Sequence, residues 1–142
     1  MGWSYLEPLA IETVTPYSGS YDRGVDQGRQ RGCRPPIRPL TADPSKYDII
    51  AVGTPTWWYT MAPAVQTFLD GVDWTGKTVI PFQTHGGWPG HVMKDIKKPC
   101  KGANFAHELA VQFDSTGGDR LETSEEEIQA WAKAVTEELC GD

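Results

Sequence analysis

The chain has 142 residues, 39% hydrophobic and 23% charged, which is ordinary for one soluble globular domain spanning residues 1–142. Its formal charge of −6 and isoelectric point near 5.0 argue against a nucleic-acid-binding surface. The acidity either serves solubility alone or prepares the exterior to dock a basic redox partner. Three scattered cysteines form no Cys-x-x-Cys pair, so neither a disulfide framework nor a metal site is expected.

The chain begins with segments whose patterns are weak. Met1–Ala10 lacks a basic start and an apolar core of signal-peptide length, and no later apolar run could span a membrane, so we expect a cytoplasmic protein. Ala10–Val14 alternates and is typical of a strand, whereas Tyr21–Arg31 is compatible with a short polar helix. Arg31–Lys46 contains four prolines and predicts an extended connection.

This part of the chain also carries the main basic concentration of an otherwise acidic protein. It could be an anion site, for a phosphate or for the 2′-phosphate of NADPH, but a solvated connector is the favoured interpretation. The residues concerned are Arg23, Arg29, Arg31, Arg34 and Arg38.

Tyr47–Gly53 is a short apolar run rich in β-branched residues, which predicts a buried parallel strand. Pro55 should end that strand and turn the chain, so that Trp57–Tyr59 lie beyond its carboxyl end. Ligands of open α/β sheets bind at such ends.

The same pattern then repeats. A helix with one apolar face follows the aromatic residues, Lys77–Phe82 predicts a second strand, and Thr84–Gly90 is a glycine-rich loop ahead of a helix at Val92–Lys97. Two loops, one aromatic and one rich in glycine, should therefore leave the same edge of one sheet. The apolar face of the first helix comprises Ala64, Val65, Phe68, Leu69 and Val72.

Leu109–Phe113 is a further expected strand, and Asp114–Asp119 is a loop before the last helix. That loop has the composition of a phosphate loop, but its strand should lie at the far edge of the sheet, so a surface turn is favoured. Ser124 and Glu127 form a capping box at the start of the last helix. Alternating strands and helices indicate an α/β protein with a parallel, doubly wound sheet.

Three ordered motifs together closely resemble the bacterial flavodoxin-like family, which binds flavin mononucleotide (FMN). They are Gly53–Trp58, Gly76–Gly87, and Asp95–Lys98 with Cys100. The resemblance implies a three-layer α/β sandwich with a mostly parallel sheet. It also implies that Trp57 and Trp58 pack beside the flavin ring while the glycine loop meets the ring edge through backbone groups.

The implied FMN site has two walls. One is Pro55, Thr56, Trp57, Trp58 and Tyr59, and the other is Thr84, His85, Gly86 and Gly87. His85 is either an acid near the ligand or a residue that orients the loop through a backbone hydrogen bond. Trp74, Trp88 and Trp131 are assigned to packing.

The family begins with a strand and a phosphate-binding loop that have no counterpart ahead of Ile11, so the first predicted strand resembles the family's second. We therefore expect weakened FMN binding and poor discrimination against riboflavin. The central edge left unpaired predicts either a move of Ile11–Val14 to that edge or a homodimer.

The leading hypothesis is an FMN-binding electron-transfer protein. The alternatives are an NAD(P)H-dependent flavin or quinone reductase, and a flavin-free scaffold that acts through association. No Ser/His/Asp set or carboxylate pair stands out, so no catalytic residue is assigned.

Overall fold

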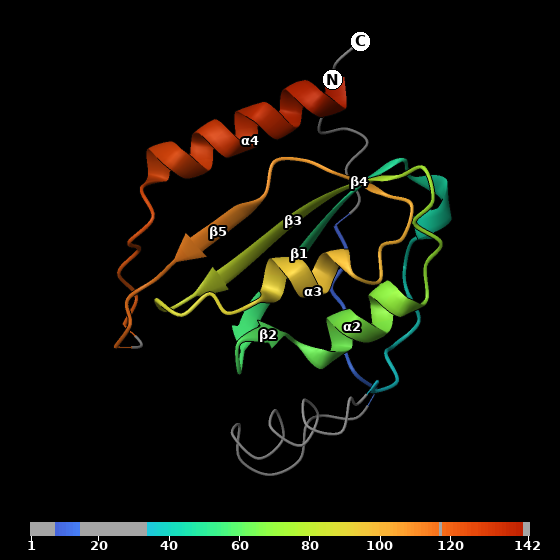
Figure 1. Ribbon diagram of the computed structural model, residues 1–142, viewed down its shortest axis with the longest axis horizontal. Coiled ribbons are helices and arrows are strands. Elements are labelled where there is room, and N and C mark those ends of the chain that lie inside the picture. The colour runs from blue at the N-terminus through green and yellow to red at the C-terminus, as the bar shows by residue number, and fades with distance from the viewer. Residues whose placement is uncertain (1–7, 15–33, 117, 141–142) are drawn as a thin grey trace.

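The computed structural model describes residues 8–14, 34–116 and 118–140. The predicted helix at 21–31, three of the five arginines and Cys33 lie outside these residues. A five-stranded, mostly parallel sheet forms the centre, with α4 on one face and α2 and α3 on the other (Figure 1). The predicted α/β architecture is confirmed.

The sheet is built around β1 and β3. β1 (Ile49–Trp57) and β3 (Thr78–His85) run parallel from the Ile49–Thr78 pair to the Pro55–Thr84 pair. β2 (Thr60–Met61) folds back antiparallel on the end of β1. On its other side, β3 pairs in parallel with β4 (Asn104–Phe105) and then with β5 (Leu109–Gln112).

β1 continues through Pro55, so the prediction that this proline ends the strand was wrong. The amide of Thr78 donates to the Asp48 carbonyl. In a parallel ladder alternate residues face one neighbour, so odd-numbered residues of β1 direct their backbone groups away from β3. Pro55, which has no N–H, belongs to that set, and the ladder with β3 loses nothing.

Pro81 accounts for the division between β4 and β5. Its missing N–H points toward these strands, and the ladder is interrupted opposite it, between the Val79–Phe105 and Phe82–Leu109 pairs. The intervening residues include His107 with φ 54°. The chain thus makes an irregular turn where the proline offers no hydrogen bond.

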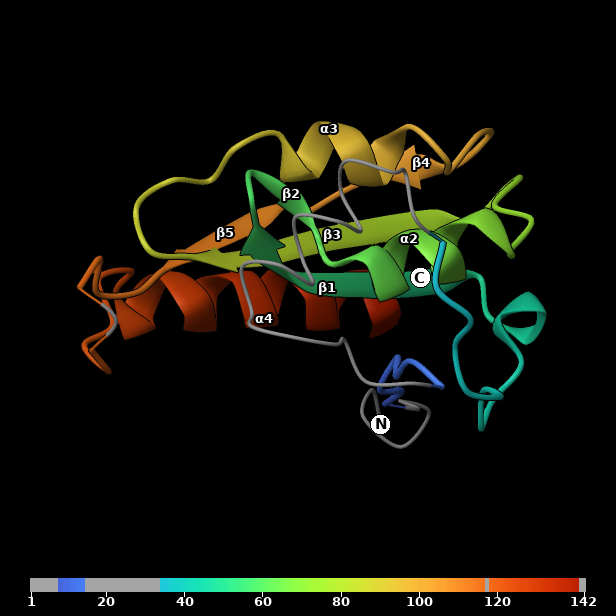
Figure 2. The same cartoon turned by 90° about the horizontal axis from the view of Figure 1, so that it is seen from below.

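The main core lies between the sheet and the two shorter helices, α2 (Pro63–Asp70) and α3 (Val92–Lys97). Val52, Val79, Leu69 and Ile96 are buried there together. The other face is covered by α4 (Glu125–Cys140) (Figure 2). Its Trp131 packs on Phe82 with ring centroids 5.6 Å apart. The Glu127 amide donates to Ser124 Oγ at 3.1 Å, which confirms the predicted cap.

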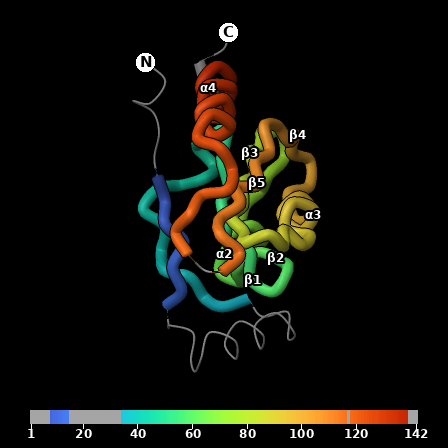
Figure 3. The backbone as a smooth tube through the Cα atoms, turned by 90° about the vertical axis from the view of Figure 1, so that its left-hand side faces the viewer, coloured from blue at the N-terminus to red at the C-terminus, as the bar shows by residue number. Residues whose placement is uncertain are grey.

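Segment 8–14 lies on the opposite side of β1 from α3 (Figure 3). It forms one antiparallel bridge, between Thr13 and Ile37, rather than the predicted strand. The 3-10 helix η2 (Pro44–Lys46) precedes β1 in the chain, and Asp43 caps it. No described strand pairs with β1 from Ile49 to Pro55 on the side away from β3.

The homodimer stays a prediction. Its physical reason is that the apolar edge of β1, which no described strand covers, is a template for a strand of another chain. Sedimentation velocity should show a species heavier than 15.7 kDa at high protein concentration. A stable monomer across the concentration range would contradict it.

Candidate functional site

The aromatic turn, Trp57–Tyr59, joins β1 to β2. Trp58 and Tyr59 have φ values of 50° and 69°, which side-chain-bearing residues rarely adopt. Their side chains are 38% and 53% exposed. Two large aromatic residues are therefore held at the surface. Contacts with neighbouring residues must stabilise their unusual backbone conformation.

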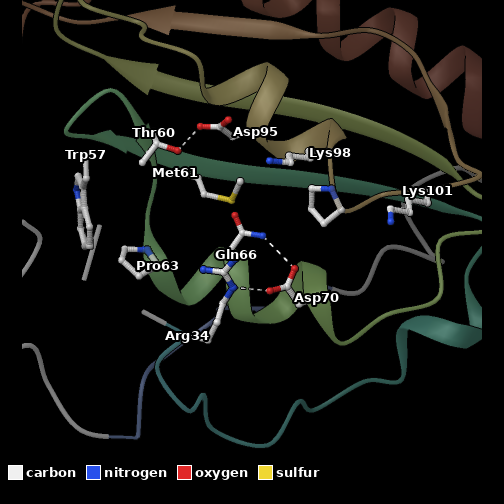
Figure 4. Close-up of a pocket in the computed structure, with 11 residues that line it drawn as sticks. Arg34, Trp57, Thr60, Met61, Pro63, Gln66, Asp70, Asp95, Lys98 and Lys101 are labelled. Atoms are coloured by element: carbon white, nitrogen blue, oxygen red, sulfur yellow. Dashed lines mark hydrogen bonds and ion pairs between the residues drawn. The ribbon is translucent and has the colours of Figure 1, made fainter. Parts of the chain in front are cut away.

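Contacts with the start of α3 hold the turn. The His91 amide donates to the Tyr59 carbonyl at 2.8 Å. The Asp95 carboxylate accepts from Thr60 Oγ1 (Figure 4). The same carboxylate also contacts the His91 ring. Gly90 has φ 59°, and a Cβ there would overlap the Tyr59 backbone. The turn and the helix thus form one locally packed unit.

The glycine loop, residues 84–90, follows β3. Buried Gln83 donates to Thr56 Oγ1 and to the Pro89 carbonyl, each at 3.0 Å. Thr56 Oγ1 in turn donates to the Thr84 carbonyl at 2.8 Å. The ends of β1 and β3 are therefore connected by side-chain hydrogen bonds as well as by the strand ladder.

His85 orients this loop, which is the second of its two predicted roles. The Gly87 amide donates to His85 Nδ1 at 3.0 Å. Partial burial lowers the pKa of His85 from its ordinary value of 6.5, because desolvation disfavours the charged form. The imidazole is thus neutral at pH 7, and Nδ1 keeps the lone pair that the amide needs.

The loop after β5 lies against the glycine loop, while β5 itself takes an edge of the sheet beyond β3 and away from β1, as predicted. The position of a Gly86 Cβ would be 3.7 Å from the Asp114 carbonyl oxygen. The Thr116 amide and hydroxyl donate to the Asp114 carboxylate, and these bonds lower the pKa of Asp114. β5 neighbours β3 directly, and strand order, which decides this contact, could not be read from composition.

Trp88 was wrongly assigned to packing. It is 62% exposed on the glycine loop and does not pack in the core. Trp74, by contrast, is 1% exposed, as predicted for a packing residue. The position of Trp88 between two glycines and Pro89–Gly90 was the signal that its segment could not enter the core.

Cavities flank the aromatic turn on two sides. One of about 420 Å³ lies between α2 and α3, where Arg34 pairs with Asp70 and where Lys98 and Lys101 also line the wall (Figure 4). Another of about 770 Å³ follows the open edge of β1. Trp57 lines both of them, which places it at the centre of the candidate site.

The structure brings the two predicted walls to neighbouring strand ends, with Pro55 opposite Thr84 in the ladder. This edge offers flat aromatic surfaces, glycine backbone and a neutral histidine. In the described part of the chain, no group of three His, Cys, Asp or Glu side chains could hold a metal ion. The helices described there include none that could cross a membrane. Burial raises the pKa of Cys100 to about 11, so its thiol stays protonated and inert.

Comparisons with known proteins give one family and several solved structures. The Flavodoxin_4 family model, described as flavodoxin, matches residues 11–135. No curated protein matches the chain.

Three solved structures share the fold. A “putative flavoprotein” from Bacteroides uniformis is 24% identical with a TM-score of 0.63, over 87% of this chain and 78% of that one. A “putative flavoprotein” from Bacteroides eggerthii is 27% identical with a TM-score of 0.60, over 88% and 78%. A flavoprotein from Lactobacillus acidophilus, determined in complex with FMN, is 17% identical with a TM-score of 0.59, over 87% and 78%.

Proposed function

The chain belongs to the flavodoxin family, and from that premise we propose that it binds FMN and acts in electron transfer. One observation carries the proposal: an exposed aromatic turn and a glycine loop lie at the carboxyl ends of the adjacent strands β1 and β3. In open α/β sheets this is where ligands bind. The FMN complex of the Lactobacillus acidophilus protein, which has the same fold, supports the choice of cofactor.

The residues at this edge fit a flavin ring. Trp57, Trp58 and Tyr59 present aromatic surface, and an aromatic pair contributes about 0.5–1.5 kcal/mol beyond the area that it buries. Gly86 and Gly87 let a ring carbonyl or nitrogen approach the backbone closely, since no Cβ intervenes, although the Gly87 N–H already donates to His85 Nδ1. The neutral His85 holds this loop without adding a charge beside the ring.

FMN would supply the redox chemistry, while the protein would set its potential through stacking, hydrogen bonds and nearby charge. Residues of the chain thus act by binding and orienting the ring, and none is assigned a catalytic role. For the 142-residue chain we also propose weak FMN binding, because the described loops around the ring site offer few cations to a phosphate. Docking of a redox partner on the acidic surface remains part of the proposal.

Flavin titration tests the proposal through tryptophan fluorescence. A stacked flavin quenches an indole, so FMN should quench the wild-type emission, and the quench should shrink in Trp57→Ala and Trp58→Ala. Trp131→Phe is the control, because Trp131 lies on the opposite face of the sheet against Phe82. Wild-type emission that FMN leaves unchanged would refute flavin binding at this turn.

Two simple measurements separate the alternative functions. A yellow protein, or quenching by FMN, excludes a flavin-free scaffold. Consumption of NAD(P)H with a quinone acceptor by the FMN-loaded protein would identify a reductase, and its absence would favour electron transfer alone.

A further inference from the structure

The larger cavity is a groove lined by both an aromatic side chain, Trp57, and a cationic one, Arg38. One wall is the open edge of β1, and the other is the segment Leu9–Thr13 with Arg38. Its volume of about 770 Å³ lies within the usual range for ligand pockets, about 300–1,000 Å³. We call it the β1 groove; its β1 and α2 residues are Gly53, Pro55, Trp57, Ala62, Ala64 and Val65.

The side chains that β1 and α2 contribute to the β1 groove are mostly apolar, but the β1 backbone gives that wall polar groups. The odd-numbered residues of β1 face away from β3. The Pro55 carbonyl on that side already accepts from Thr54 Oγ1 at 2.8 Å, whereas the N–H and carbonyl of Gly53 are directed to the groove side. No described strand pairs with them. Such backbone groups require hydrogen-bond partners, and the hydroxyls of a polyol chain could provide them.

Arg38 provides the positive charge of the groove. Its Nε lies 3.4 Å from the Thr13 carbonyl oxygen and 3.9 Å from a Glu12 carboxylate oxygen, so both described contacts are long. A guanidinium has five N–H donors in a fork that matches a phosphate. Glu12 also lines the groove and would compete with a bound anion for Arg38.

We propose that the β1 groove holds the ribityl phosphate of FMN, with the phosphate at Arg38 and the ring at Trp57. This inference rests on the proposed function and adds the phosphate partner. Trp57 belongs to both the aromatic turn and the β1 groove. A flavin ring bound on the turn would therefore place its ribityl chain at the mouth of the groove. The open backbone of β1 then meets the ribityl hydroxyls, and Arg38 meets the charge.

Riboflavin tests this assignment because it has the ring and the ribityl chain but no phosphate. A charge-assisted hydrogen bond contributes about 1.5–3 kcal/mol, so wild type should prefer FMN to riboflavin about tenfold or more. This inference replaces the poor discrimination against riboflavin that the sequence led us to expect. Arg38→Gln should lose that preference by weakening FMN binding alone. Calorimetric titration of both ligands measures it, and added salt should reduce the FMN preference of wild type only.

Two further variants make the test independent of damage to the fold. Glu12→Gln removes the competing carboxylate and should raise the FMN preference severalfold, a gain that misfolding cannot produce. Arg34→Gln is the matched control, because Arg34 pairs with Asp70 in the other cavity, and it should leave the preference unchanged.

The outcomes distinguish this inference from the function beneath it. Wild type that binds neither ligand would refute flavin binding itself. An FMN preference that survives Arg38→Gln, that is lost in Arg34→Gln, or that exceeds a thousandfold in wild type places the phosphate elsewhere and overturns the groove assignment. Equal weakening of FMN and riboflavin in Arg38→Gln also overturns it, because Arg38 would then act on the ring.

Discussion

Gly90→Ala should cost the protein most of its flavin affinity while leaving it folded. Gly90 has φ 59°, and its added Cβ would overlap the carbonyl oxygen, the Cα and the carbonyl carbon of Tyr59. Because these are backbone atoms, no side-chain rotation relieves the overlap, and the aromatic turn must move away from α3. If one molecule in a hundred kept the native turn, the apparent Kd would rise about a hundredfold.

Calorimetric titration with riboflavin is the appropriate measurement for this variant, since riboflavin reports on the ring site without the phosphate. Circular dichroism checks that the fold persists. Gly71→Ala is the matched control: Gly71 has φ −93°, and its Cβ would meet atoms at ordinary distances of 3.6 Å. Equal affinities for Gly90→Ala and wild type would show that the turn does not form the ring site.

Among the proposed substitutions, Trp74→Ala should lower the free energy of unfolding most. The side chain is 1% exposed, meets Phe68 edge-on at 6.0 Å between centroids, and donates from Nε1 to the Leu69 carbonyl at 2.8 Å. Removing a buried tryptophan costs about 3–5 kcal/mol through lost burial and the remaining cavity. That is a large share of the 5–15 kcal/mol typical of a domain.

Urea unfolding measures this effect, and the exposed Trp88 gives a control of the same residue type. Trp88→Ala should change the free energy of unfolding by no more than about 0.5 kcal/mol, because the residue is 62% exposed. Trp74→Phe should fall between the two, since it keeps most of the volume but leaves the Leu69 carbonyl without its donor. Similar losses for Trp74→Ala and Trp88→Ala would contradict the assigned core.

Local patterns were sufficient to predict most elements. The apolar runs at β1 and β3, the apolar face of α2 and the Ser124 cap of α4 each appear where expected. These features depend on hydrogen bonds and side-chain periods within a few residues. For the same reason the sequence could place both candidate walls at one edge of the sheet, since each follows the end of a parallel strand.

The errors arose where a residue's effect depends on a distant partner. Pro55 is compatible with β1 only because its missing N–H faces the side on which no described strand pairs with it. Trp88 is as apolar as Trp74, yet only the packing of the chain separates an exposed loop from the core.

The sequence by itself determined the fold class, the order of most elements and the aromatic and glycine residues of the candidate ring site. Only the tertiary structure decided that Asp95 secures the aromatic turn, that His85 accepts from Gly87, and that Arg38 shares a groove with Trp57. Two of these three arrangements involve residues that are 19 or more positions apart in the chain. Strand order and register set such distances, and composition or periodicity within one segment does not encode them.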